Sequence, residues 1–396
     1  MEIKKKKRVR ALFVLLACIV STFVGAGLGY STRSLYTAPI TADLGINRSA
    51  YNLSYTIASL LCMAIAVNFG RIKSFLGSYK RVCLIGMLSL AIGEIIGSNN
   101  RSIFTIYLTT ALITLGFNWV TSIPMTGIVA NWFPKHNGLV LGIVLSGTSL
   151  GGAIFSPLVS RWIENNGWRS AFLYSAIIIG AGFLFILFAL KESPNNISQT
   201  AEKKEKYKFD TGLLRNPNFY LIGIAMALMP FSLQAVALNA PTIINDAGHS
   251  VELAGTINSV MFAACAISKI GSGWLNDKLG LPVTRTILII CGCIGCISLI
   301  FSQSVPMLYS YAIFYGIGQS LALMFMPLHI RYVFPDRDPA EVMGPMTAFN
   351  LIGLMSTPAI SFMYELTGTY TIVLIIVTAS LAAVGLLASL AKPSHS

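Results

Sequence analysis

The sequence contains few charged residues for its length. Only 11% of its 396 residues are Asp, Glu, Lys or Arg, whereas about 25% is usual for a soluble domain. Hydrophobic residues make up 55%, and the mean hydropathy is +0.71. This composition excludes a soluble globular protein. It predicts a polytopic protein of the lipid bilayer, whose helices satisfy their own backbone hydrogen bonds.

The sequence also lacks the patterns of enzymes and cofactor sites. It has no phosphate-cradling loop that ends in Gly-Lys and no nucleophile elbow, so we expect no enzyme activity and no cofactor. All seven cysteines lie in apolar stretches, and the segment Cys291–Cys296 (CGCIGC) has no His or acidic residue beside it. A metal site is one interpretation of this segment. Small residues that pack a membrane helix are the interpretation we favour.

The net charge of +13 could indicate nucleic-acid binding, but the positions of the basic residues argue against it. Most of the 28 lysines and arginines lie at the N-terminus and in alternate turns between apolar stretches. This is the positive-inside pattern of a membrane protein. It predicts a plasma-membrane (inner-membrane) protein with both termini in the cytoplasm, and no nucleic-acid partner.

Twelve apolar stretches are long enough to cross a bilayer. The expected fold is therefore all-α, with twelve transmembrane helices in two six-helix bundles. The predicted domains are an N-terminal bundle (1–190), a cytoplasmic linker (191–217) and a C-terminal bundle (218–396). The predicted spans cover roughly 11–37, 50–70, 82–98, 103–131, 138–162, 169–190, 218–243, 253–275, 286–303, 306–330, 343–364 and 370–391.

The two predicted bundles repeat one another. Several short patterns recur about 200 residues apart, and each copy contains six spans in the same orientation. Parallel repeats of this kind place a substrate at their interface, near the middle of the membrane. The recurring positions include Phe133-Pro134 and Phe334-Pro335, Gly70 and Gly273, Gly77 and Gly280, and Ala38-Pro39 and Ala240-Pro241.

Apart from Arg161 and Arg169, which stand at the outer ends of their spans, two cations lie inside the predicted spans, Arg33 and Lys269. Ionisable residues in a membrane are costly, so each indicates a functional site. Helical spacing places Lys269 on one face with Asn258, Phe262 and Cys265, as expected of a helix that borders a water-filled cavity. The alternative for Lys269 is a side chain that extends to the headgroups. The alternative for Arg33, which closes its predicted span, is a position at the outer interface.

Several stretches resemble the major facilitator superfamily. The turns GRIKSFLG (70–77) and GWLNDKLG (273–280) are similar to its loop motif, although Ser74 stands where an aspartate is usual. The segments 36–61 and 131–173 resemble the branch of oxalate/formate antiporters and monocarboxylate porters. The resemblance implies transport by alternating access. It assigns conformational gating to Asp277 and to the motif glycines Gly70, Gly77, Gly273 and Gly280.

The resemblance to this branch also implies a substrate site. A cation in the first helix and one in the eighth bind the substrate carboxylate there, and Arg33 and Lys269 stand at these positions. Phe349 replaces the eleventh-helix lysine of oxalate antiporters, which argues against a dicarboxylate, and Cys265 replaces the acid that precedes the eighth-helix cation. Further polar side chains in spans are expected to complete the cavity, or else to form interhelical hydrogen bonds: Asn118, Tyr315, Gln319 and Asn350.

The sequence thus predicts a secondary active transporter of small monocarboxylate anions, monomeric in its functional unit and proton-linked or exchanging anions. The alternatives are a transporter of another solute, such as a drug or a sugar, and a membrane sensor that does not transport. Glu94, near the outer end of the third span, is the only carboxylate within the predicted spans. No dedicated acid relay is therefore expected, and Lys269 itself is the predicted proton carrier if transport is proton-linked.

Overall fold

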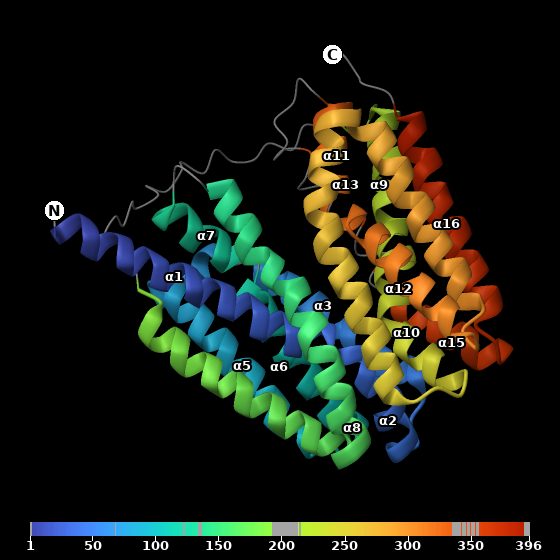
Figure 1. Cartoon of the computed structure of the whole chain (residues 1–396), viewed down its shortest axis with the longest axis horizontal. Coiled ribbons are helices and arrows are strands. Elements are labelled where there is room, and N and C mark those ends of the chain that lie inside the picture. The colour runs from blue at the N-terminus through green and yellow to red at the C-terminus, as the bar shows by residue number, and fades with distance from the viewer. Residues whose placement is uncertain are drawn as a thin grey trace. The chain divides into compact units, whose positions relative to one another are not determined.

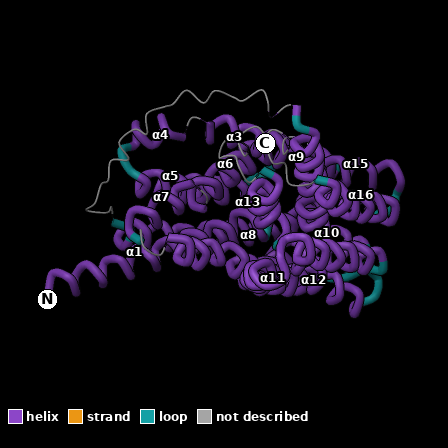
Figure 2. The backbone as a smooth tube through the Cα atoms, turned by 90° about the horizontal axis from the view of Figure 1, so that it is seen from above, coloured by secondary structure: helices purple, strands orange, loops and turns teal. Residues whose placement is uncertain are grey.

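The chain folds into helices that group into two compact units. Unit 1 comprises Met1–Ala201 with Val251–Ser259, and unit 2 comprises Glu202–Ser250 with Val260–Ser396. Helices fill the described part of the chain, without any strand there (Figure 2), which confirms the all-α class. The computed structural model describes residues 2–67, 69–121, 123–133, 137–191, 213, 215–334, 342, 346, 349, 353 and 356–391. The predicted domain boundaries stay a prediction.

Figure 1 follows the helices in chain order. Those of unit 1 are α1 (Glu2–Ala26), the π-helical turn η1 (Gly27–Ser31), α2 (Arg33–Leu44), α3 (Arg48–Val67), α4 (Phe69–Leu76), α5 (Tyr79–Ser98), α6 (Ile103–Thr121), α7 (Ile123–Trp132) and α8 (Asn137–Ala189). Those of unit 2 are α9 (Pro217–Met229), the π-helical turn η4 (Pro230–Gln234), α10 (Ala235–Asp246), α11 (Val251–Ile300), α12 (Val305–Gln319), α13 (Leu321–Val333), α15 (Ser356–Thr367) and α16 (Thr371–Leu390). The first turns of α11 belong to unit 1.

Long apolar helices dominate both units. Within the described residues, eight helical stretches are long and apolar enough to cross a membrane. One of them, Val140–Ala189, contains Gly167 at φ 79°, so it comprises two helices that meet at a sharp turn. Gly280 makes a similar turn in α11 at φ 77°. A side chain is strained at such angles, which explains why glycine stands there.

Small residues let the helices of unit 1 approach closely. The helices α1 and α5 both pack along α8. A Cβ atom added to Gly27 would lie 2.9 Å from the Cα of Gly151, and one added to Gly151 would lie 2.2 Å from the carbonyl oxygen of Phe23. Membrane helices gain their packing energy from such close contacts, because lipid is as apolar as their side chains.

The first helix of each unit contains a π-turn. The turn η1 separates α1 from α2, and η4 separates α9 from α10. Gly27 and Pro230, which begin them, are as far apart in the chain as Gly77 and Gly280, so the two turns occupy the same place in the repeat. The helix continues after η1 to Leu44, well beyond the predicted end of the first span. Arg33 therefore lies inside this helical segment and does not close it, contrary to the prediction.

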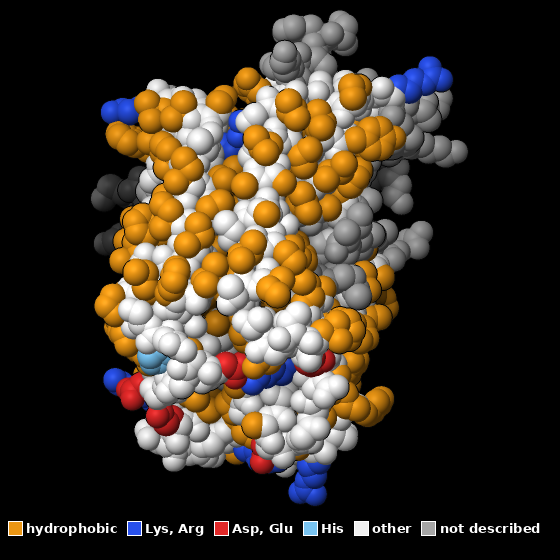
Figure 3. All heavy atoms as spheres, turned by 90° about the vertical axis from the view of Figure 1, so that its right-hand side faces the viewer, with side chains coloured by type: hydrophobic (Ala, Val, Ile, Leu, Met, Phe, Trp, Pro, Cys, Tyr) orange, Lys and Arg blue, Asp and Glu red, His pale blue; other side chains and the backbone are white. Residues whose placement is uncertain are grey.

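The surface is largely apolar. Figure 3 shows hydrophobic side chains spread over most of one face, with acidic and basic side chains gathered in a belt near its lower end. Many large hydrophobic side chains of α11 and α16 are exposed, including those of Ile290, Ile297, Ile375 and Leu386. Apolar helices with exposed apolar side chains fit a lipid environment.

Candidate functional site

Arg33 is held in the interior of unit 1 by a carboxylate and a backbone carbonyl. It is the first residue of α2, which follows η1 and Thr32, and only 3% of its side chain is exposed. Its Nε donates to the carbonyl oxygen of Leu28 at 3.0 Å. One terminal nitrogen forms an ion pair with Oε1 of Glu94 in α5, which is fully buried. We call Arg33, Glu94 and their neighbours the Arg33 site.

The helix packing explains how these two residues meet. A Cβ atom added to Gly29 would lie 2.7 Å from Cδ2 of Leu90, so the glycine lets α5 come close to the π-turn. Glu94 stands one helical turn after Leu90 and shares its face. Arg33 stands one turn after Gly29 on the other helix. The close approach at Gly29 and Leu90 therefore places the next pair along the two helices in contact.

Aromatic rings surround the guanidinium. The Cζ atom of Arg33 lies 5.0 Å from the ring centroid of Tyr36 and 5.2 Å from that of Phe172. Ring faces at this distance attract a cation, and more strongly where water is excluded. Beside Arg33 lies a small cavity bordered by hydroxyl groups, among them those of Tyr51 and Tyr55. The cavity has a volume of about 10 Å³, which leaves room for about one water molecule.

Glu94 is only partly satisfied. Its Oε2 atom is buried and has no hydrogen-bond partner among the described residues, while Oε1 contacts Arg33. Buried polar atoms are nearly always hydrogen-bonded, and an unpartnered one in a native structure calls for an explanation. The Arg33 site therefore contains one complete ion pair and one carboxylate oxygen free to accept a proton.

The sequence reasoning identified Arg33 but missed its partner. It treated Glu94 as a residue near the outer end of a span and not as part of a site. The relevant signal was present, because a carboxylate and a cation inside spans of the same bundle are expected to pair with one another. What the sequence could not supply was the close approach of the two helices.

Two of the predicted residues of unit 2, Tyr315 and Gln319, form hydrogen bonds to backbone carbonyl groups. Tyr315 in α12 is fully buried, and its hydroxyl donates to the carbonyl oxygens of Ser232, at 3.2 Å, and Leu233. Gln319, one turn later, donates from Nε2 to the same Leu233 oxygen at 3.1 Å. The two side chains thus lie together, and both form hydrogen bonds to the π-turn η4.

Lys269 lies half-buried in α11. Cys265, which shares a face of α11 with Lys269, is buried. Asn258 is also buried, and its Nδ2 donates to the carbonyl oxygen of Ser31 at 3.1 Å and to Oγ of Ser156 at 3.0 Å. This face of α11 is therefore turned toward protein at both Asn258 and Cys265. The substrate-binding role of Lys269 stays a prediction.

The remaining predicted positions are scattered. Asn118, in α6, donates to the carbonyl oxygen of Thr114 in its own helix at 2.8 Å and does not line the cavity beside Arg33. Asn350 and the side chain of Asp277 lie outside the described residues. Of the motif glycines, Gly70 lies in α4 and Gly273 in α11. Gly77 and Gly280 have φ values of 77° each, so both end a helix by a left-handed turn.

Arg285 is a buried cation that stands just outside the predicted span 286–303. Only 4% of Arg285 is exposed. Its guanidinium donates to the carbonyl oxygen of Ala388 at 2.8 Å and to Oγ of Ser389 at 2.7 Å, and contacts Nε2 of His329 at 3.2 Å. The turn at Gly280 brings the helix back immediately, so Arg285 already lies inside unit 2.

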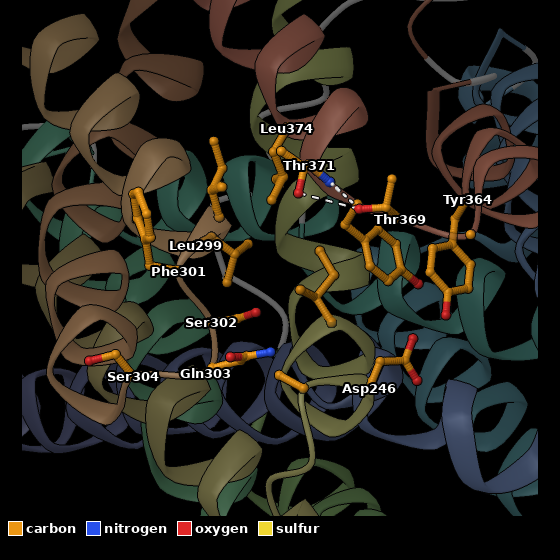
Figure 4. A pocket seen from close by; sticks show the side chains of 15 residues that line it. Asp246, Leu299, Phe301, Ser302, Gln303, Ser304, Tyr364, Thr369, Thr371 and Leu374 are labelled. Carbon is orange, nitrogen blue, oxygen red and sulfur yellow. Dashed lines mark hydrogen bonds between the residues drawn. The ribbon is translucent and has the colours of Figure 1, made fainter.

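A pocket in the described part of unit 2 has the opposite character to the Arg33 site. Its volume is about 620 Å³, and Figure 4 shows Asp246, Ser302, Gln303 and Tyr364 around it. Asp246 is the one charged residue among the described residues of its lining. A carboxylate ligand would face a carboxylate there, and like charges repel. Within the part of the chain that the structure describes, no group of three His, Cys, Asp or Glu could hold a metal ion.

Comparisons with solved structures establish the fold. The nucleoside transporter NupG superposes with a TM-score of 0.76 at 13% identity, covering 95% of this chain and 98% of that one. A D-xylose-proton symporter gives a TM-score of 0.70 at 15% identity and covers 97% of each chain. The expected all-α fold is confirmed, whereas the number of twelve spans stays a prediction beyond the eight helical stretches found in the described residues.

Comparisons with curated proteins agree with the predicted branch. The oxalate:formate antiporter of Oxalobacter formigenes is 26% identical over 284 residues, which cover 70% of this chain and 65% of the antiporter, just under two thirds of its length. Monocarboxylate transporter 13 of Bos taurus is 23% identical over 311 residues, covering 76% of this chain and 70% of that protein. The family model described as Major Facilitator Superfamily matches residues 15–302 and 220–396. The chain therefore belongs to the major facilitator superfamily.

Proposed function

We propose that this membrane protein is a secondary transporter of small monocarboxylate anions that works by alternating access. The observation that carries the proposal is the buried guanidinium of Arg33, held in unit 1 between aromatic rings and the carboxylate of Glu94. A guanidinium presents two parallel donors that match a carboxylate in geometry as well as charge. The relatives named as an oxalate:formate antiporter and as monocarboxylate transporters support the same substrate class.

Lys269 is the proposed second ligand. It is the cation of the eighth predicted span, and its half-buried position leaves it accessible to a solute that enters between spans. Phe349 stands where a dicarboxylate would need another cation, and its ring packs edge-on against that of Phe219 at 5.7 Å. With one cation in each repeat, the proposed site suits a substrate with one carboxylate better than a substrate with two. We accordingly propose a monocarboxylate as the substrate.

The proposed topology places both termini in the cytoplasm and the protein in the plasma membrane, with a monomer as the functional unit. The distribution of lysine and arginine supports this orientation. Reaction of single introduced cysteines with an impermeant reagent, applied to whole cells and to inverted vesicles, tests it. Labelling of the chain ends from outside whole cells would contradict the orientation.

The function is tested by ligand binding and by flux. Purified protein is heated with a panel of monocarboxylates, dicarboxylates, sugars and nucleosides, because a ligand that binds the folded state raises its melting temperature. Stabilisation by monocarboxylates is the expected result, followed by their uptake into proteoliposomes. If the protein binds carboxylates but does not transport them, it is a sensor. A panel in which only sugars or nucleosides stabilise the protein would refute the substrate class.

Two substitutions locate the site. Arg33→Ala and Lys269→Ala should each abolish carboxylate flux while the protein still inserts in the membrane, because each removes a proposed ligand. Arg101→Ala is the matched control, since Arg101 is an exposed arginine of unit 1 and should be silent. Near-normal flux in both site variants would refute the assignment of these residues.

A further inference from the structure

We propose that Glu94 is the proton-binding group of the transport cycle, and that a substrate carboxylate replaces Glu94 on Arg33 when Glu94 takes up a proton. The inference rests on the proposed function and adds the coupling to it. Two observations carry it. Among the described residues, Arg33 has one carboxylate partner, and the second oxygen of that carboxylate is buried without a hydrogen-bond partner.

The charge balance at Arg33 favours the exchange. In the structure, one guanidinium and one carboxylate face each other in an enclosed space. A substrate carboxylate that joined them on Arg33 would place two carboxylates against one guanidinium, and a like charge close by disfavours the ionised form of a carboxyl group. If a proton from water binds Oε2 of Glu94, the carboxylate becomes a neutral acid. The substrate then takes its place, so Arg33 again faces a single negative charge.

The groups around Glu94 allow this reaction. The titratable side chains around Glu94 and its partner Arg33 are those of Tyr36 on α2 and of Tyr51 and Tyr55 on α3. The helices α6 and α8 contribute neutral groups to its surroundings, such as Thr109 and Phe172. Within the described residues of this site, Glu94 is therefore the one carboxylate that can gain a proton.

The other repeat offers no equivalent acid. Cys265 stands one helical turn before Lys269, where monocarboxylate porters are expected to have an acidic residue. The carboxylate of this chain instead lies beside the cation of the first repeat. The acid relay that the sequence analysis did not expect is thus proposed in unit 1, and Lys269 then binds substrate without carrying the proton.

The exchange also has an energetic consequence for uptake. Moving one negative charge inward against about 100 mV costs about 2.3 kcal/mol. One carboxylate that moves together with one proton carries no net charge, so this cost vanishes. Uptake should therefore respond to a pH gradient and be insensitive to membrane potential.

The test compares two assays in proteoliposomes. The first assay is counterflow exchange of labelled carboxylate, which needs only the binding site. The second is accumulation driven by an imposed gradient of one pH unit, a tenfold difference in proton concentration, which can concentrate substrate up to about tenfold when one proton moves with each anion. Glu94→Gln replaces the carboxyl group with a neutral amide of nearly the same shape. It should retain counterflow and lose accumulation.

The control variant is Asp43→Asn. It neutralises a carboxylate of unit 1 that pairs with Arg169 at 2.8 Å and is exposed, so it should change neither assay. Accumulation that persists in Glu94→Gln would overturn the proposal. Absence of both activities in the wild type, for every carboxylate tried, would instead refute the proposed function.

A second measurement decides the case in which Glu94→Gln fails to fold. Wild type and Lys269→Arg in weakly buffered detergent are mixed with saturating carboxylate, and a pH-indicator dye reports proton uptake. Arginine cannot give up its proton. Proton uptake that persists in Lys269→Arg supports Glu94 as the binding group. Uptake that is lost in this variant, or absent from a wild type that binds carboxylate, overturns the proposal.

Discussion

The two π-turns occupy the same place in the repeat and are stabilised by different chemistry. In unit 1, Leu28 of η1 accepts hydrogen bonds from the charged guanidinium of Arg33, which Glu94 balances. In unit 2, Leu233 of η4 accepts hydrogen bonds from the neutral side chains of Tyr315 and Gln319. The backbone deformation is common to both halves, whereas charge is used in only one of them.

This difference separates the structural demand from the functional one. A π-turn disturbs the regular hydrogen bonding of its helix, so in lipid its carbonyl groups need donors from neighbouring side chains. Tyrosine and glutamine meet that need in unit 2 without burying any charge. Arginine meets it in unit 1 at the cost of burying an ion pair, which is weak evidence for stability. The charged pair is therefore better explained by a role in transport.

The largest expected effect breaks the charged half of the comparison. Arg33→Ala leaves Glu94 buried without a partner, and removing one member of a buried pair costs about 3–5 kcal/mol. The melting temperature of the purified protein should fall clearly. The double variant Arg33→Ala with Glu94→Ala removes both charges and should melt higher than Arg33→Ala alone. Equal melting temperatures for the two variants would show that the pair is not coupled.

The next effect concerns a turn that both halves share. Gly77→Ala and Gly280→Ala each place a side chain at φ 77°, a backbone conformation that residues other than glycine rarely adopt and that costs about 1–3 kcal/mol. The two variants should be destabilised by similar amounts in thermal unfolding, unlike variants of the two π-turns. Gly180→Ala is the control, because Gly180 is helical and a Cβ atom there would meet nothing within 4 Å. A silent Gly280→Ala would contradict this account.

The third effect tests the neutral half. Tyr315→Phe removes the hydroxyl that donates to Leu233, and hydrogen bonds between membrane helices contribute about 0.6 kcal/mol on average and at most about 1.7. A small loss of thermal stability with carboxylate flux retained is the expected result if Tyr315 only fastens η4. Lost flux at unchanged stability would instead place Tyr315 in the substrate cavity, as the sequence analysis predicted.

The sequence predicted the fold well because its signals are local. Apolar length identifies spans. The recurrence of Gly77 at Gly280 follows from the same left-handed turn in both halves. Each of these features is decided by a few neighbouring residues and can be found without knowing which helices touch.

The site was harder to predict because it depends on contacts between distant segments. Arg33 was identified from its place in a span, but its pairing with Glu94 depends on the close approach of Gly29 and Leu90. Arg285 falls just outside the predicted span 286–303, because hydropathy alone could not show how sharply Gly280 bends the chain. Polar residues such as Tyr315 could not be divided into structural and functional groups before their hydrogen bonds were seen.

The smallest expected effect concerns the motif turn itself, in which the two halves also differ. Asp277 stands in the second-half motif and Ser74 in the first-half motif. The resemblance implies that the aspartate would face the N-terminus of a helix in the other half and favour one conformation, which stays a prediction. A carboxylate at a helix N-terminus typically contributes about 0.3–1 kcal/mol, which shifts the inward and outward populations only a few-fold.

Asp277→Asn should therefore change the accessibility of cysteine probes on the two membrane faces, in opposite directions, while transport continues. Ser74→Asp is the matching change in the other half, and it should shift the same balance by supplying the charge that this half lacks. Because one half carries the charge and the other does not, we expect the lock to be one-sided in the wild type. Unchanged probe accessibility in both variants would show that the motif charge does not set the conformational balance.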